Sequence, residues 1–131
     1  MGRLRILVVD DQPEILTIVE HALTRAGHEV VTAYNAARAL RVVRQRQFDL
    51  ILTDLSMPDI GGDELIKDLR GLPSTERTRI LAVTAHQGSS IASAAVANGC
   101  DGVIMKPFTG AQLREKVADY AREWGLSGSA G

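Results

Sequence analysis

The chain has very little cysteine and no long hydrophobic run. Cys100 is the only cysteine in the sequence, so an internal disulfide is impossible and a reducing cytoplasm is the expected location. No apolar run approaches the roughly 20 residues that a membrane-spanning helix needs. The few residues before the first predicted strand leave no room for a signal peptide. The sequence therefore predicts a cytoplasmic protein that does not enter a membrane.

An excess of charge of either sign is also missing. Fifteen Lys and Arg residues face sixteen Asp and Glu residues, and the pI is about 6.3. Aromatic residues are scarce and do not interleave with basic runs, which argues against direct nucleic-acid binding. His21, expected on an exposed helix face, and His28, expected in a turn, have no ligand partner at metal-binding spacing. We expect one domain over residues 1–126 and a flexible Gly/Ser-rich tail over residues 127–131.

Apolar, mostly β-branched runs alternate with helical patterns five times along the chain. The predicted strands cover residues 5–9, 29–33, 50–54, 79–84 and 103–106. The predicted helices begin at Pro13, after Asn35 and at residues 63, 91 and 110, and the last three end at residues 70, 98 and 124. Strict alternation predicts an α/β fold, a doubly wound parallel sheet of five strands with five helices on its two faces.

Several residues mark the ends of these helices. Pro13 suits a first helical turn, and Gly27 suits the end of the same helix. Asn35 is a predicted N-cap, and Thr109 with Gln112 matches a capping box. In the first helix, apolar residues at positions 15, 18, 19, 22, 23 and 26 predict a stripe that faces the sheet.

Three carboxylates follow two of the predicted buried strands. Asp10 and Asp11 come directly after residues 5–9, and Asp54 comes after residues 50–53. If these strands are neighbours, the three acids meet at one sheet edge, where each close pair costs about 4 kcal/mol at an effective dielectric near 20. A hard divalent cation or Lys106, which follows another short apolar run, can balance that charge. Taken singly, each acid is also compatible with a helix cap or a solvated turn. Lys106 taken singly is also compatible with an ordinary surface lysine.

The chain resembles the receiver domain of two-component response regulators over about residues 4–124. The matching motifs are Asp10-Asp11, Asp54 with Met57-Pro58 and Gly62, Thr84-Ala85, and Lys106-Pro107-Phe108. Each motif is short, but their shared order at successive strand ends is specific. The resemblance implies a flavodoxin-like sheet of order 2-1-3-4-5 and a cis peptide bond before Pro107.

The resemblance also implies a role for each site residue. Asp54 would accept a phosphoryl group from a phosphohistidine on a sensor histidine kinase or a histidine phosphotransfer protein. Asp11, Asp54 and the backbone carbonyl of Ser56 would bind Mg²⁺, with Mn²⁺ as a substitute, and Asp10 would act through water. Lys106 would pair with Asp54 and then with a phosphoryl oxygen.

Other residues would govern the response to phosphorylation. In the family, a hydroxyl at the position of Thr84 turns onto the phosphoryl group, and Ala85 follows it. Ser56 and His86 occupy the positions that flank the attacking water, so we expect His86 to make phosphoryl loss depend on pH. Val103 stands where the family often has a mobile aromatic residue. Because a β-branched side chain has few rotamers, the signal is expected to pass through residues 84–90 and the following helix.

Three other functions remain alternatives at this point. An aspartyl-phosphate hydrolase shares the chemistry, but its second acid is replaced here by Ser56. A flavodoxin-type FMN carrier shares the fold, but Asp10 and Asp11 would repel its phosphate. A receiver-like binding module that works without phosphorylation would not need every site position filled. The downstream partner is an unknown protein or a fused output domain. The absence of charge in residues 89–99 argues against a salt-bridged dimer on that face and leaves an apolar contact there open, so we expect a monomer or weak dimer.

Overall fold

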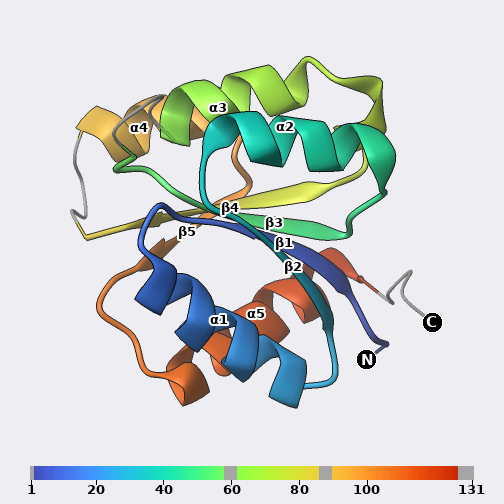
Figure 1. The fold of residues 1–131 in the computed structure, drawn as a ribbon, viewed down its shortest axis with the longest axis vertical. Coiled ribbons are helices and arrows are strands. Elements are labelled where there is room, and N and C mark those ends of the chain that lie inside the picture. The colour runs from blue at the N-terminus through green and yellow to red at the C-terminus, as the bar shows by residue number, and fades with distance from the viewer. Residues whose placement is uncertain (1, 58–61, 86–89, 127–131) are drawn as a thin grey trace.

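The computed structural model describes residues 2–57, 62–85 and 90–126, which form a sheet between two layers of helices (Figure 1). The strands are β1 (Arg5–Val9), β2 (Glu29–Ala33), β3 (Leu50–Asp54), β4 (Arg79–Thr84) and β5 (Gly102–Met105). They lie in the order β2-β1-β3-β4-β5, and all paired neighbours are parallel. The predicted fold class and strand order are confirmed.

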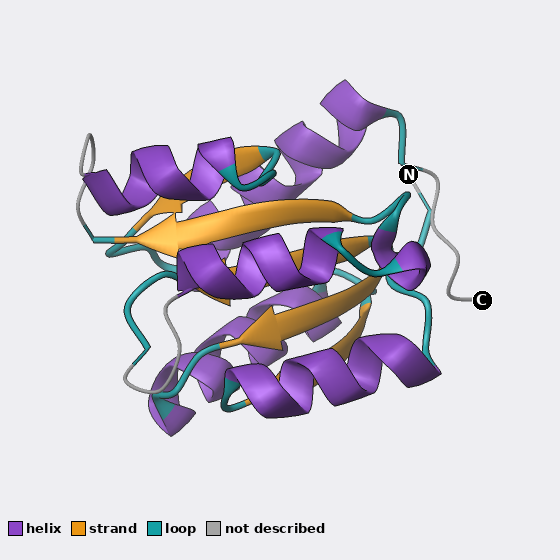
Figure 2. Cartoon of the chain, turned by 90° about the horizontal axis from the view of Figure 1, so that it is seen from above, coloured by secondary structure: helices purple, strands orange, loops and turns teal. Residues whose placement is uncertain are grey.

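The helices cover both faces of this sheet, as Figure 1 shows. One layer holds α1 (Pro13–Arg25) and α5 (Gly110–Trp124), and the other holds α2 (Ala36–Gln45), α3 (Gly62–Arg70) and α4 (Ser90–Ala97). In Figure 2 the visible strand arrows point in one direction. The carboxyl ends of the strands therefore share one edge of the sheet and their amino ends share the other.

The predicted helix signals have their expected contacts. The backbone N–H of Arg38 donates to the Asn35 side chain at 2.8 Å, and both hydrogen bonds of the Thr109–Gln112 capping box are present. Gly27, just after α1, has a φ of 95°, which glycine adopts without a steric penalty. These local contacts explain why the predicted and observed helix ends agree closely.

A few details differ from the prediction. Helices α3 and α4 each begin one residue earlier than expected, and a 3₁₀ helix, η1 (Pro73–Thr75), was not predicted. Ile18 is 48% exposed, because it lies at the margin of the α1 stripe that faces the sheet. His28, expected in a turn, directly follows the turn at residues 26–27 and is buried, and its ring accepts a hydrogen bond from the backbone of Leu4.

Two hydrophobic cores lie on the two faces of the sheet. Successive β1 residues point to opposite faces, so Leu7 packs with α2 and α3 whereas Val8 packs with α1 and α5. Both cores contain fully buried aliphatic side chains, which fix the backbone at the strand ends. None of the helices in the described ranges is long and apolar enough to cross a membrane. The predicted tail, residues 127–131, lies outside those ranges, so the proposed domain boundary stays a prediction.

Candidate functional site

The three predicted acids meet at the carboxyl edge of the sheet. Asp10 follows β1 and Asp54 ends β3, and the two strands are paired neighbours. One carboxylate oxygen from each of Asp10, Asp11 and Asp54 lies within 4.8 Å of the others. Asp10 and Asp54 are buried, whereas Asp11 is more exposed. Such a group of oxygen ligands suits a hard divalent cation, and its open side is at Asp11.

Lys106 brings an ammonium group to the same place. Its Nζ lies 3.2 Å from Oδ2 of Asp10 and 3.5 Å from Oδ1 of Asp54. The lysine backbone is held by a 2.8 Å hydrogen bond from its N–H to the carbonyl of Thr84, and the Lys106–Pro107 peptide is cis. The resemblance led us to expect a pair with Asp54, and the structure adds a closer contact with Asp10.

Backbone N–H groups also stabilise the carboxylates. The N–H of Gln12 donates to Asp10 at 2.9 Å, and the N–H of Ser56 donates to Asp54 at 3.3 Å. Burial, together with the nearby Asp54 charge, raises the pKa of Asp10, although the Gln12 N–H and Lys106 oppose the shift. Ionising Asp10 therefore costs folding free energy as the pH rises above its usual pKa, chiefly because the carboxylate is buried.

The predicted switch residues lie at the neighbouring strand ends. Thr84 ends β4, directly beside β3, and its side chain is buried. Ala85 is exposed, and His86 lies outside the described residues. Val103 is partly buried against the α2–α3 core, and its carbonyl accepts a hydrogen bond from the Tyr120 hydroxyl at 3.2 Å. The edge thus brings Thr84 into the neighbourhood of Asp54, while Val103 lies further back in β5.

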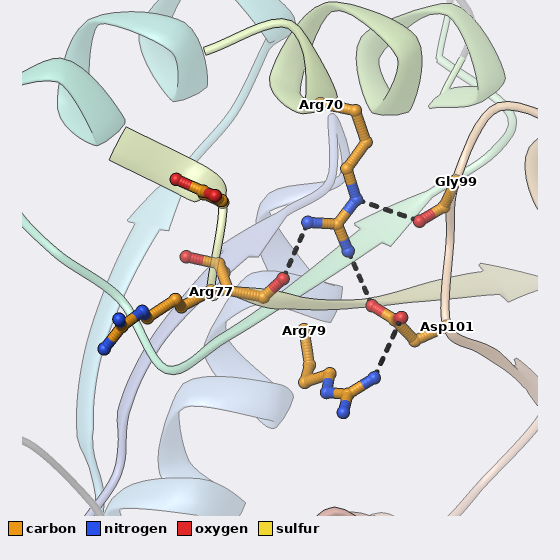
Figure 3. Close-up of a pocket in the computed structure, with 7 residues that line it drawn as sticks. Arg70, Arg77, Arg79, Gly99 and Asp101 are labelled. Carbon is orange, nitrogen blue, oxygen red and sulfur yellow. Dashed lines mark hydrogen bonds and ion pairs between the residues drawn. The ribbon is translucent and has the colours of Figure 1, made fainter. Parts of the chain in front are cut away.

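Sequence reasoning missed an ion-pair cluster at the opposite, amino edge of the sheet. Arg70, at the end of α3, lies 2.6 Å from Asp101, and Arg79 lies 3.3 Å from the other oxygen of Asp101. Figure 3 shows both arginines converging on this carboxylate in an open cleft of about 500 Å³. A basic residue in a last helical turn is so common that nothing in the sequence marked Arg70 as special.

A sequence profile described as the response regulator receiver domain matches residues 6–118. The chain belongs to this receiver family. Its relatives include a chemotaxis protein CheY homolog of Campylobacter jejuni, which is 33% identical over 118 residues, or 88% of this chain and 91% of that protein. It also matches the transcriptional regulatory protein YrkP of Bacillus subtilis at 34% identity, over 92% of this chain but only 50% of that protein.

Solved receiver structures have the same fold. CheY4 of Vibrio cholerae superimposes with a TM-score of 0.85 and 31% identity, covering 90% of this chain and 98% of that one. Response regulator TrrA of Thermotoga maritima, solved with Mg²⁺ and beryllofluoride, gives a TM-score of 0.76 and 32% identity over 91% of this chain and 98% of that one. This receiver chain therefore has the CheY-like α/β fold, and its acidic cluster is compatible with the divalent-metal site typical of such domains.

Proposed function

We propose that this receiver accepts a phosphoryl group on Asp54 in a Mg²⁺-dependent reaction and acts as a switch for partner binding. The observation that carries the proposal is the meeting of three acids with the Lys106 ammonium at one sheet edge. The phosphoryl donor would be a phosphohistidine on a sensor histidine kinase or a histidine phosphotransfer protein in the cytoplasm. The TrrA relative, solved with Mg²⁺ and a phosphoryl mimic, supports this assignment.

In the proposed transfer, a carboxylate oxygen of Asp54 attacks the phosphorus atom of the phosphohistidine. A P–O bond forms, the P–N bond breaks, and the imidazole leaves with the bonding electron pair. Asp11, Asp54 and the Ser56 carbonyl would hold Mg²⁺, with Asp10 acting through water, and the ion would supply positive charge for the phosphoryl oxygens. The Lys106 ammonium, already 3.5 Å from Asp54, supplies a second positive charge on the protein side.

The buried Asp54 also has to be reachable by the donor. Its carboxylate lies at a strand end, next to the more exposed Asp11, so the approach is from the carboxyl edge of the sheet. The exposed Ser56 borders the same side. No acid stands two residues after Asp54, which is where a phosphoaspartate hydrolase has its second carboxyl. We therefore propose a single phosphorylation event with slow loss of the phosphoryl group rather than repeated turnover.

The test is labelling with acetyl phosphate and Mg²⁺, followed by peptide mapping. We expect one phosphoryl group per chain on Asp54, none with EDTA, and none in Asp54→Asn. Asp68→Asn, which changes an exposed aspartate of α3, is the matched control and should label like the wild type. Stoichiometric labelling of Asp54→Asn at another aspartate would refute the assignment, and multiple turnover would favour the hydrolase.

The switch itself is proposed to work through Thr84. The buried hydroxyl at the end of β4 would donate to the new phosphoryl oxygen, and the change would pass through Ala85 and His86 to α4 while the Val103 rotamer stays unchanged. Thr84→Ala should accept phosphate normally but lose the amide shifts of α4 that beryllofluoride induces. An unaltered α4 response in that variant would rule out this route.

The lifetime of the phosphoryl group is proposed to depend on His86. Its position in the sequence, two residues after Thr84, is one of those that flank the attacking water in the family. Protonation near neutral pH would alter access of that water, so decay should vary between pH 6 and 8 in the wild type and less in His86→Ala. Identical pH profiles for the two proteins would contradict this role.

A further inference from the structure

Arg70 links the end of α3 to two other segments at the amino edge of the sheet, the α3–β4 connection and the α4–β5 connection. Its guanidinium donates to the Gly99 carbonyl at 2.9 Å, to the carbonyls of Thr75 and Thr78 at 3.0 and 2.8 Å, and to Asp101 at 2.6 Å. Figure 3 shows the side chain reaching from the end of α3 across to the Gly99–Asp101 segment. Only an arginine provides enough N–H groups, in a fixed plane, to make all these contacts.

The Arg70 side chain packs against Gly99 so closely that a residue with a Cβ atom would not fit there. The Gly99 φ of 113° strongly favours glycine, and a Cβ atom at this position would lie 2.8 Å from Cγ of Arg70. Gly99 follows the carboxyl end of α4, where backbone N–H groups of residues 98, 99 and 100 donate to carbonyls of residues 94, 96 and 95. The Arg70 stem and guanidinium thus hold the carboxyl end of α4 from outside the helix.

Asp101 extends the same attachment into the sheet. Besides the two arginines, its carboxylate accepts a 2.8 Å hydrogen bond from the N–H of Ile80, and its own N–H donates to the Ile80 carbonyl at 2.7 Å. Arg79, the third member of the cluster, also lies over the Trp124 ring. The junction between α4 and β5 is therefore attached directly to α3 and β4, and through the Arg79 side chain to α5.

The body of α4 has much weaker attachments. Residues 89–99 contain no charged side chain. Among residues 92–97, whose side chains the structure describes, Ala95 alone is buried. A small buried side chain provides little apolar area, so residues 92–97 contribute little free energy against sliding or tilting of the helix. The contrast between a firmly held carboxyl end and a loosely packed body defines where the helix can move.

We propose that Arg70 is a positioning residue that makes the carboxyl end of α4 a pivot. When phosphorylation of Asp54 changes the end of β4, α4 turns about the Arg70–Gly99–Asp101 junction, and the displacement is confined to the amino end of the helix. The inference rests on the proposed phosphorylation switch. It adds that coupling depends on a residue at the edge of the sheet opposite the phosphorylated aspartate.

The first experiment measures amide hydrogen exchange in unphosphorylated Arg70→Met, which keeps the stem over Gly99 but loses the guanidinium. Exchange at residues 98–100 should rise at least about tenfold, while amides of β1 stay within about twofold of the wild type. Arg77→Met is the matched control, because Arg77 lines the same cleft and makes no ion pair with any described residue. Arg70→Lys, which keeps the charge but loses the planar fork, replaces the Met variant if the latter does not fold.

The second experiment adds Mg²⁺ and beryllofluoride and records amide shifts. In the wild type and in Arg77→Met, shifts should appear at residues 84–92 and leave residues 98–101 unchanged. In the Arg70 variant, shifts should extend to residues 98–101, which a general loss of stability would not produce.

Several results would overturn the pivot. Wild-type exchange at residues 98–100 in the Arg70 variant would show that the residue does not hold the helix end. A uniform increase over all amides would show that Arg70 stabilises the whole fold instead. An unchanged beryllofluoride pattern would show that the junction does not direct the motion. A wild-type protein without any beryllofluoride shift would refute the phosphorylation switch itself, which is a separate outcome.

Discussion

At the carboxyl edge of the sheet, Asp10, Asp11 and Asp54 lie together, and Lys106 is the one cation among the described residues that forms ion pairs with this group, through Asp10 and Asp54. At the amino edge, a single acid, Asp101, pairs with two arginines, Arg70 and Arg79. Both edges are built from strand-end carboxylates and long cationic side chains. They differ in the balance of charge, since acids outnumber cations at the first edge and cations outnumber acids at the second.

This difference corresponds to two uses of charge. An excess of carboxylates destabilises the fold by mutual repulsion, but it creates affinity for a divalent cation and for the chemistry that follows. A carboxylate whose oxygens all have donors stabilises local structure and binds nothing further. Glu29 also lies between two arginines, Arg5 and Arg46, at the amino edge next to the start of β1, and both pair with its Oε2. The two edges therefore differ in charge balance and not in residue type. We call the carboxyl edge, with its excess of acids, the chemical edge, and the amino edge, with its paired acids, the structural edge.

Removing the cation from the chemical edge should give the largest change in stability. Lys106→Met leaves three acids without a positive partner, so the free energy of unfolding in EDTA should fall by about 2–3 kcal/mol. Mg²⁺ should restore part of this loss because the ion replaces the missing charge. Urea unfolding with EDTA and with Mg²⁺ measures both effects, and Lys116→Met, an exposed lysine of α5, is the control. A variant as stable as the wild type in EDTA would contradict the charge argument.

Removing the acid from the structural edge should destabilise the protein somewhat less. Asp101→Asn keeps an acceptor for the Ile80 N–H but leaves Arg70 and Arg79 without their anion, so unfolding should become easier by about 1–2 kcal/mol, with labelling of Asp54 unchanged. The control is Asp119→Asn, whose pair with Arg122 is exposed, and its cost should stay below about 0.5 kcal/mol. Equal costs for the two variants would mean that the Asp101 cluster is an ordinary surface pair.

Removing an acid from the chemical edge should stabilise the fold, whereas the two preceding substitutions should destabilise it. Asp11→Asn takes away a repelling charge, so in EDTA the free energy of unfolding should rise by about 0.5–1 kcal/mol. The same change removes a proposed Mg²⁺ ligand, so the Mg²⁺ affinity should fall sharply. Chemical unfolding and a Mg²⁺ titration monitored by intrinsic fluorescence or amide shifts check the two parts. If Asp11→Asn lowers stability in EDTA, the site is not under repulsion and the comparison of the two edges fails.

The smallest expected effect concerns His28, close to the Arg5–Glu29 end of the amino edge. Burial lowers the pKa of its ring, although nearby Asp49 opposes the shift, and its Nδ1 accepts the N–H of Leu4 at 3.1 Å. The folded state therefore favours the neutral ring, so the stabilising contribution is complete above pH 6.5, the usual histidine value, and decreases as the pH falls below it.

Unfolding measured at several pH values between 7.5 and 5 tests this contribution. His28→Gln should lose less stability than the wild type over that range, whereas His21→Gln, which changes an exposed histidine, should follow the wild type. Identical slopes for His28→Gln and the wild type would show that the buried ring does not limit stability in acid.

Much of the molecule follows from local sequence signals. Alternating apolar runs and helix caps such as Asn35 and Thr109 act over a few residues, so the elements and their order could be predicted. The acids of the chemical edge were also predictable, because a residue that ends a buried parallel strand has one possible edge to occupy. The strand order came from the family motifs rather than from periodicity, which does not specify which strands are neighbours.

Only the tertiary structure decided which distant charges meet. Arg70 and Asp101 are separated by 31 positions, and nothing local distinguishes this arginine from its exposed counterparts on other helices. The burial of His28 depends likewise on the approach of Leu4, 24 positions away. Sequence patterns report periodicity and short-range hydrogen bonds, which are properties of neighbouring residues. Long side chains that cross between elements depend on the packing distance and relative position of those elements, and these become defined only when the two cores are assembled.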